Sequence, residues 1–203
     1  MRKDFKIAGL FYELNGFKFR KFLNIVRNNS SPKNPDLMVV MMNPGSSRPI
    51  NGDDNYNKES EAVPDRTQDQ IIRLMNNCGF NYARILNLSD LREPKSSVFY
   101  NTINKLEYQN ISHSIFDLKR SEDFEELFVT DIPVIYAWGV NKKLLNLAIQ
   151  TINRIGETKP IGLNKEGLVY AYYHPLPQNY TKQKKWVEKI TEMIKKGISD
   201  FKP

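Results

Sequence analysis

The sequence predicts a three-layer α/β/α sandwich, in which helices cover both faces of a central four-stranded parallel sheet and a β-hairpin precedes the core. Short apolar runs alternate four times with amphipathic, helix-like segments, which is typical of a parallel sheet. Two β-like segments flank Asn15-Gly16, a strong two-residue hairpin signal. The length of 203 residues suits one domain with its own core. We therefore treat residues 1–203 as a single domain, with a hairpin and loop at 1–36 and the α/β core at 37–203.

The expected strands come first. The hairpin strands are Phe5–Leu14 and Phe17–Val26. The four core strands are expected at Leu37–Met42, Ala83–Leu88, Val134–Trp138 and Leu168–Tyr173, each a nearly continuous apolar run of the kind that is buried on both faces.

Helix signals lie between these strands. Thr67 and Gln70 have capping-box spacing and open a helix that ends at Gly79. Weaker patterns predict short helices over Val98–Tyr108 and after Ser121. The last two helices are expected to begin at Asn141 and Thr181 and to end at Gly156 and Gly197.

Composition restricts the function classes. Cys78 is the only cysteine, which excludes an internal disulfide, a cysteine zinc cage and a cysteine-held iron–sulfur cluster. We expect no metal and no cofactor. The longest apolar run is too short to span a bilayer, and we recognise no secretory signal, so the expected location is cytoplasmic.

The net charge of +7 favours a polyanionic partner. Residues 1–37 carry eight Lys or Arg against three acids, and residues 180–203 carry seven Lys against three acids. Solubility alone explains such a charge equally well. Nucleic acid, DNA in particular, is the expected partner, and a monomer is favoured.

The candidate site lies at the carboxyl ends of the core strands, because open α/β sheets bind ligands there. Asn43-Pro44-Gly45 follows the first core strand, Asn87 closes the second, and His174-Pro175-Leu176-Pro177 follows the fourth. Each motif alone has a plainer explanation. Asn-Pro-Gly is a good turn sequence, and a lone histidine is more often structural than catalytic. Their placement along one edge is what indicates a site.

Taken in order, these motifs resemble those of the uracil-DNA glycosylase superfamily. Met41-Met42-Asn43-Pro44-Gly45 is similar to its G-x-N-P-G motif, with Met41 in place of the first glycine. Ile85-Leu86-Asn87 is similar to the L-L-N that ends its second strand, and Tyr136-Ala137-Trp138-Gly139 to its L-L-W-G. His174-Pro175-Leu176-Pro177 is similar to its H-P-S-P, with Leu176 in place of the serine.

The chain also resembles an uncharacterised bacterial and phage domain family. That family has a hairpin followed by a strand that ends in L-N-P-S-T-A-D, then a D-x-T-I-R-R helix, a strand ending in N-L, and a W-G. Here the corresponding residues are Asn43 to Ser47, Asp69 to Arg73, Asn87-Leu88 and Trp138-Gly139. This resemblance implies the same fold and no established activity.

The first resemblance implies hydrolysis of the N-glycosidic bond of a damaged or deaminated base in DNA. His174 would donate a hydrogen bond to the departing base, and Asn43 would position the attacking water. Asn87 would recognise a pyrimidine edge, and Leu176 would wedge into the duplex.

Other groups would bind the rest of the substrate. Pro44, Gly45, Ser46 and Ser47 would contact the base or a phosphate, and Lys184 and Lys185 the DNA backbone. Tyr56 and Phe80 are the candidates for stacking on the base. The alternative is a catalytically inactive nucleotide- or nucleic-acid-binding module of the same fold.

Overall fold

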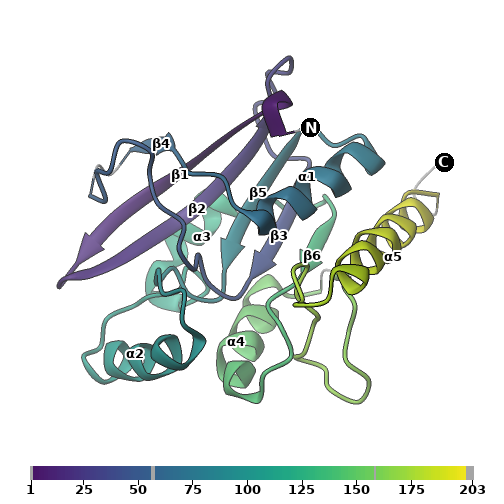
Figure 1. Ribbon diagram of the computed structural model, residues 1–203. Helices are drawn as coiled ribbons and strands as arrows, with labels where there is room; N and C mark the ends of the chain where they lie inside the picture. The colour runs from purple at the N-terminus through teal and green to yellow at the C-terminus, as the bar shows by residue number, and fades with distance from the viewer. Residues whose placement is uncertain (1, 56–57, 158, 200–203) are drawn as a thin grey trace.

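A six-stranded mixed sheet forms the centre of the computed structural model, which describes residues 2–55, 58–157 and 159–199 (Figure 1). The strand order is β4-β1-β2-β5-β3-β6. The strands are β1 (Phe5–Leu14), β2 (Phe17–Arg27), β3 (Leu37–Met41), β4 (Glu59–Glu61), β5 (Tyr82–Asn87) and β6 (Val134–Tyr136). Strand β3 pairs in parallel with β5 and β6, and the other pairs are antiparallel. The prediction of an α/β chain with a hairpin is confirmed at this level.

Helices cover both faces of the sheet. They are α1 (Arg66–Cys78), α2 (Ser96–Tyr108), α3 (Ser121–Leu127), α4 (Leu145–Ile155) and α5 (Tyr180–Ser199). Helices α1 and α5 pack on one face, and α2, α3 and α4 contribute to the core on the other. Alternate residues of β3 enter the two cores, because successive strand side chains point to opposite faces. Leu37 and Val39 lie in the first core, and Met38 and Val40 in the second.

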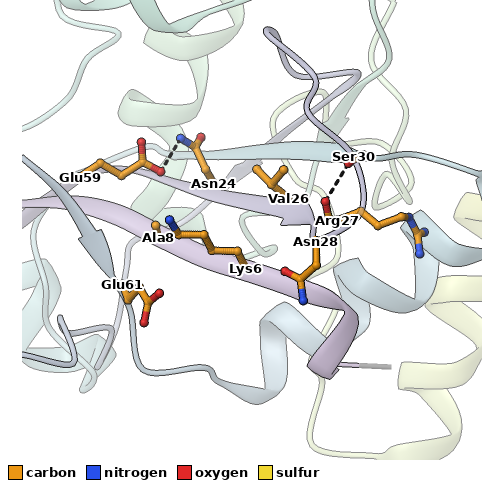
Figure 2. A pocket seen from close by; sticks show the side chains of 9 residues that line it. All are labelled: Lys6, Ala8, Asn24, Val26, Arg27, Asn28, Ser30, Glu59 and Glu61. Atoms are coloured by element: carbon orange, nitrogen blue, oxygen red, sulfur yellow. Dashed lines mark hydrogen bonds between the residues drawn. The ribbon is translucent and has the colours of Figure 1, made fainter.

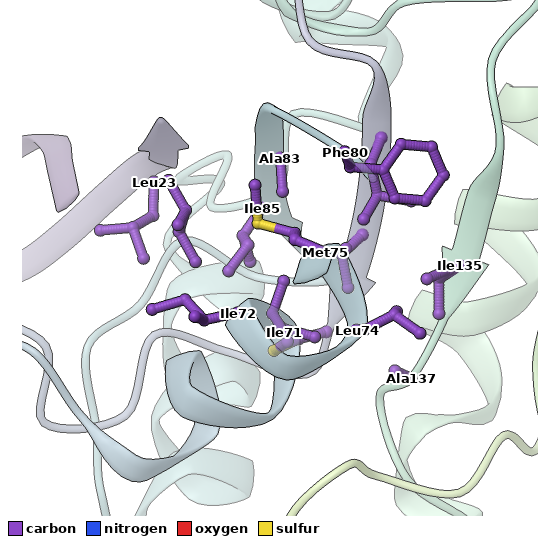
Figure 3. Close-up of a cluster of buried hydrophobic side chains, with 14 of the residues drawn as sticks. Leu23, Ile71, Ile72, Leu74, Met75, Phe80, Ala83, Ile85, Ile135 and Ala137 are labelled. Carbon is purple, nitrogen blue, oxygen red and sulfur yellow. The ribbon is translucent and has the colours of Figure 1, made fainter. Parts of the chain in front are cut away.

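The amphipathic face of α1 explains how the first core forms (Figure 3). Ile71, Ile72, Leu74 and Met75 recur at helical spacing and are all fully buried. They pack against sheet residues such as Ile85. This packing fixes the start of α1 close to the carboxyl ends of β3 and β5.

The hairpin forms at the predicted turn. Asn15 and Gly16 have φ angles of 51° and 76°, and β1 pairs with β2 from Leu14–Phe17 outward. Two successive positive φ angles match the right-handed twist of the strands, and Asn-Gly adopts them at low cost. The turn prediction is therefore confirmed.

The predicted fourth parallel strand at Leu168–Tyr173 is not a strand, so the parallel part of the sheet contains β5, β3 and β6 alone among the described residues. The segment folds back on the end of β6 instead. Tyr172 forms isolated bridges with Gly139 and Asn164, and Trp138 Nε1 donates to the Tyr170 carbonyl at 2.7 Å. Val169 is 75% exposed, so the apolar run is not covered on both faces.

Two helix caps also differ from the prediction. Asp65, not Thr67, caps α1, and it forms the capping box with Gln68. Asn179 Oδ1, not Thr181, accepts a hydrogen bond from the Lys182 N–H at the start of α5. In both cases the side chain that accepts a hydrogen bond from an N–H of the first turn lies two residues before the predicted cap. Within the described residues, no helix is long and apolar enough to cross a membrane.

Candidate functional site

The candidate site is the edge of the sheet where β3 and β5 end. These two strands are parallel, so Asn43 and Asn87 emerge on the same side. Strand β2 is antiparallel to β5, so the early part of β2, including Arg20, lies beside the end of β5. Arg20 N–H donates to the Asp90 carbonyl at 2.9 Å, which confirms this placement.

Asn43 links two loops at this edge. Its Nδ2 donates to the carbonyls of Leu91 at 3.2 Å and Glu93 at 2.7 Å. The side chain is half-buried, and its Oδ1 accepts from no described residue. Asn43 can therefore hold a water or a ligand donor with Oδ1, but the amide cannot remove a proton.

The turn after Asn43 is closed by a hydrogen bond from the Ser47 N–H to the Pro44 carbonyl at 3.1 Å. Gly45 has a φ of +60°, which glycine adopts without strain. Pro44 and Ser47 are buried, whereas Ser46 is exposed. The N–H groups of Gly45 and Ser46 donate to no described residue.

Asn87 forms a hydrogen bond with Arg20, which the sequence did not indicate as a site residue. Arg20 Nη2 donates to Asn87 Oδ1 at 2.9 Å, and Arg20 Nη1 donates to Ser47 Oγ at 2.9 Å. The exposed fractions of Arg20, Ser47 and Asn87 are 3%, 3% and 1%. We call these three residues the Arg20 cluster. In this arrangement the Asn87 amide oxygen already accepts from Arg20, and its Nδ2 has no partner among the described residues.

Two donors of the Arg20 cluster are unpartnered. Among the described residues, neither Arg20 Nε nor Asn87 Nδ2 has a hydrogen-bond partner, and both atoms are buried. Burial lowers the pKa of Arg20 to about 10, while Asp65 and Asp90 act to raise it. The guanidinium therefore remains charged at neutral pH without a directly bonded carboxylate.

His174 is held in one tautomer. Its Nδ1 accepts from the Leu176 N–H at 3.1 Å, so in the neutral ring the proton is on Nε2. Burial lowers the pKa of His174 to about 4, and Asp65 acts to raise it. The same carboxylate also acts on Arg20. At neutral pH His174 is an uncharged donor.

The start of α5 forms an exposed surface next to His174. Tyr173 and Tyr180 are 47% and 55% exposed. Lys184 Nζ lies 5.0 Å from the centroid of the Tyr180 ring, and Lys182 and Lys185 are also exposed. We call these five residues the α5-start surface. Leu176, the predicted wedge, is half-buried beside it.

The two stacking candidates do not join this edge. Phe80 lies in the core against α1, before β5 begins, which is the opposite end of the strand (Figure 3). Tyr56 lies outside the described residues. Tyr173 and Tyr180 are exposed aromatics that sequence patterns did not single out, although they directly flank the His174 motif.

A second buried polar group lies behind the site. Asp90 is 0% exposed, and its Oδ2 accepts from Arg120 Nη1 at 2.5 Å and from Tyr12 OH at 3.0 Å. Burial raises the pKa of Asp90 to about 6, against the opposing effect of Arg120. Its neighbour Ser89 contacts His113 Nδ1 at 2.9 Å.

The largest hollow described, about 520 Å³, lies elsewhere, on the hairpin strands (Figure 2). Lys6, Arg27, Glu59 and Glu61 line it with opposite charges, and it is open to solvent. None of the three hollows described includes Asn43, Asn87 or His174. No group of three or more metal-ligating side chains occurs in the described part of the chain.

Comparison with known proteins gives one match. The model of a family described as protein of unknown function (DUF1643) matches residues 24–176, about three quarters of the chain. The chain belongs to the DUF1643 family. In this DUF1643 protein the matched segment contains Asn43, Ser47, Asn87 and His174, and it ends before α5. No curated protein and no solved structure matches the chain.

Proposed function

We propose that this DUF1643 protein binds single-stranded nucleic acid, DNA in particular, along the α5-start surface, with a base directed to Asn43 and His174. The observation that carries the proposal is the mixture of exposed tyrosines and lysines directly next to His174. The sequence from residue 167 to residue 187 contains Lys182, Lys184 and Lys185 and no acidic residue. Phosphates and bases therefore both have complementary groups on this surface.

The chemistry of each contact follows from the exposed groups. Tyr173 and Tyr180 present aromatic faces on which bases stack, at about 1–3 kcal/mol per base. The lysines attract phosphates and displace their counterions. Helix α5 has no acidic residue in its first turn, so a phosphate there would offset an unfavourable placement of lysines.

Fluorescence anisotropy with labelled oligonucleotides across a salt series tests this proposal. The pair Lys184→Ala and Lys185→Ala removes two phosphate contacts, so the slope of log affinity against log salt should become shallower by about 1.4. The matched control is Lys33→Ala with Lys105→Ala. These lysines are exposed, Lys33 in the loop before β3 and Lys105 on α2, which packs on the face opposite α5.

Tyrosine substitutions test the stacking part separately. Tyr173→Ala and Tyr180→Ala should each lower affinity by about tenfold or more at every salt concentration, because stacking carries little salt dependence. Absence of binding at low salt, or equal slopes for the two lysine pairs, would contradict the proposal.

A second candidate function is hydrolysis of N-glycosidic bonds in DNA. The observation that favours it is the fixed tautomer of His174, whose Nε2 proton can stabilise charge on a departing base. Asn43 Oδ1 can position the water. In single-turnover reactions with uracil-, hypoxanthine- and thymine-mismatch substrates, His174→Ala should lower the rate by about 10²–10³-fold at unchanged DNA affinity. If wild type forms no abasic site with any of them, hydrolysis of these substrates is excluded and the binding function stands.

A further inference from the structure

The Arg20 cluster contains a buried cation that the described residues do not neutralise by a direct contact. Arg20 donates to two neutral oxygens, Ser47 Oγ and Asn87 Oδ1. The nearby carboxylates form no hydrogen bond to the Arg20 guanidinium, although Asp90 Oδ1 is buried and has no partner among the described residues. Asp65 accepts from the first turn of α1, and Asp90 accepts from Arg120 and Tyr12. A buried charge without a hydrogen-bonded counter-ion is strongly unfavourable.

A second guanidinium lies on the other side of Ser47. Arg92 Nε donates to the Ser47 carbonyl at 2.5 Å, and Arg92 Nη1 pairs with Asp54. The charge of Arg92 acts on Arg20 and lowers its pKa, so the two cations repel each other. Asp54 is bonded to Arg92, and Asp65 and Asp90 act on Arg20 only through space, so the Arg20 guanidinium has no directly bonded anion among the described residues.

The unpartnered atoms are both donors. Arg20 Nε carries one proton and Asn87 Nδ2 carries two, neither nitrogen can accept a hydrogen bond, and Asn87 Oδ1 already accepts one from Arg20. The imide edge of uracil presents a donor as well as acceptors, so it does not match this pair. A group with acceptor oxygens alone and a negative charge does match it.

We propose that the Arg20 cluster is an oxyanion-binding site, which takes a phosphate group through hydrogen bonds from Arg20 Nε and Asn87 Nδ2. The site is separate from the α5-start surface and does not depend on nucleic-acid binding there. Both donors are buried and none of the three described hollows reaches them, so phosphate binding requires the neighbouring turn at Gly45 and Ser46, where Ser46 is exposed, to move aside. Inorganic phosphate and the phosphate of a nucleotide share this chemistry.

Thermal unfolding of the full chain tests the site with inorganic phosphate, and with chloride at matched ionic strength. Wild type should show a saturable rise in Tm of roughly 5 °C in saturating phosphate, and no rise in chloride. A nucleoside 5′-monophosphate and its parent nucleoside distinguish the source of the phosphate. A tighter response to the monophosphate than to inorganic phosphate assigns the site to nucleotides, and an equal response assigns it to free phosphate.

Asn87→Asp is the decisive variant, because it places a carboxylate on Arg20 within the protein. The anion-free Tm should stay level or rise, and the response to phosphate should be lost. Asn101→Asp, an exposed position on α2, makes the same charge change and should keep the response. Arg20→Lys keeps a charge but loses Nε, and should weaken phosphate binding by about tenfold or more even if Asn87→Asp does not fold.

Three results would overturn the proposal. The first is no response of wild type to phosphate or to the monophosphate, in which case water satisfies the two donors. The second is a full phosphate response in Asn87→Asp or in Arg20→Lys. The third is loss of the response in the Lys184→Ala, Lys185→Ala pair, which would place the anion on the α5-start surface.

Discussion

Removing Arg120 should make stability strongly dependent on pH. Asp90 is fully buried, and its pKa is about 6 even with Arg120 hydrogen-bonded to it. Without Arg120 the carboxylate loses its main favourable charge, so its folded-state pKa rises further. The unfolded chain still releases this proton near pH 4.

The sign and size of the effect follow from linkage. Because the folded-state pKa is raised, the unfolded chain loses the Asp90 proton first, and stability falls as pH increases through the interval between the two pKa values. In wild type this fall ends near pH 6. In Arg120→Gln it continues above pH 6 at up to about 1.4 kcal/mol per pH unit. Between about pH 6 and pH 8 the variant should therefore lose up to about 3 kcal/mol more than wild type.

Urea unfolding followed by tryptophan fluorescence measures this difference, since Trp138 and Trp186 are both buried. Lys21→Gln is the matched control, because Lys21 pairs with Asp123, the other partner of Arg120, without contacting Asp90. Its loss of stability should be the same at about pH 5.5 and about pH 8. An equal loss for Arg120→Gln at those two pH values would refute the reasoning.

Three further substitutions have clear expectations. Burial lowers the pKa of His113 to about 4, so the unfolded chain takes up this proton first and stability falls as pH decreases from about 6.5 to about 4. In urea unfolding, His113→Gln should reduce this loss of stability at low pH by up to about 3 kcal/mol. A Cβ on Gly162 would lie 2.7 Å from the Tyr136 carbonyl oxygen, so Gly162→Ala should destabilise by about 1–3 kcal/mol. A Cβ on Gly197 in α5 would contact no other atom within 4 Å, so Gly197→Ala should raise the free energy of unfolding by about 0.5–1 kcal/mol and raise Tm slightly. A lower Tm would contradict this.

The features that local sequence determines were predicted well. Asn15-Gly16 specifies its turn through two backbone angles, and the runs at β3 and β5 are apolar because both faces are covered. The segment at 168–173 is also apolar, but pairing with a neighbour decides whether such a run becomes a strand. Tyr172 meets Gly139 beyond the end of β6 and forms isolated bridges.

The candidate site was predictable in part for a similar reason. Asn43 and Asn87 could be placed on one edge because parallel strands end on the same side. Arg20 could not be placed at this edge from the sequence, because its position depends on β2 running antiparallel beside β5. An arginine between Phe19 and Lys21 in a hairpin strand has no local signal for burial.

Arg20 also decides how the site divides recognition between its two asparagines. If Asn87 donates to a phosphate and accepts from Arg20, both the nitrogen and the oxygen of its amide are already engaged, which disfavours a bidentate contact with a base. Base recognition then depends on Asn43 Oδ1, an acceptor, and His174 Nε2–H, a donor, and an imide edge complements that pair.

Asn87→Asp tests this division through base preference. Competition between uracil-, cytosine- and adenine-containing oligonucleotides should give the same order of affinities in wild type and in the variant, while the phosphate response disappears. A changed order of bases would show that Asn87 reads the base directly. Asn87 Oδ1 would then accept from the imide N–H, either through its second lone pair or after Arg20 has moved away.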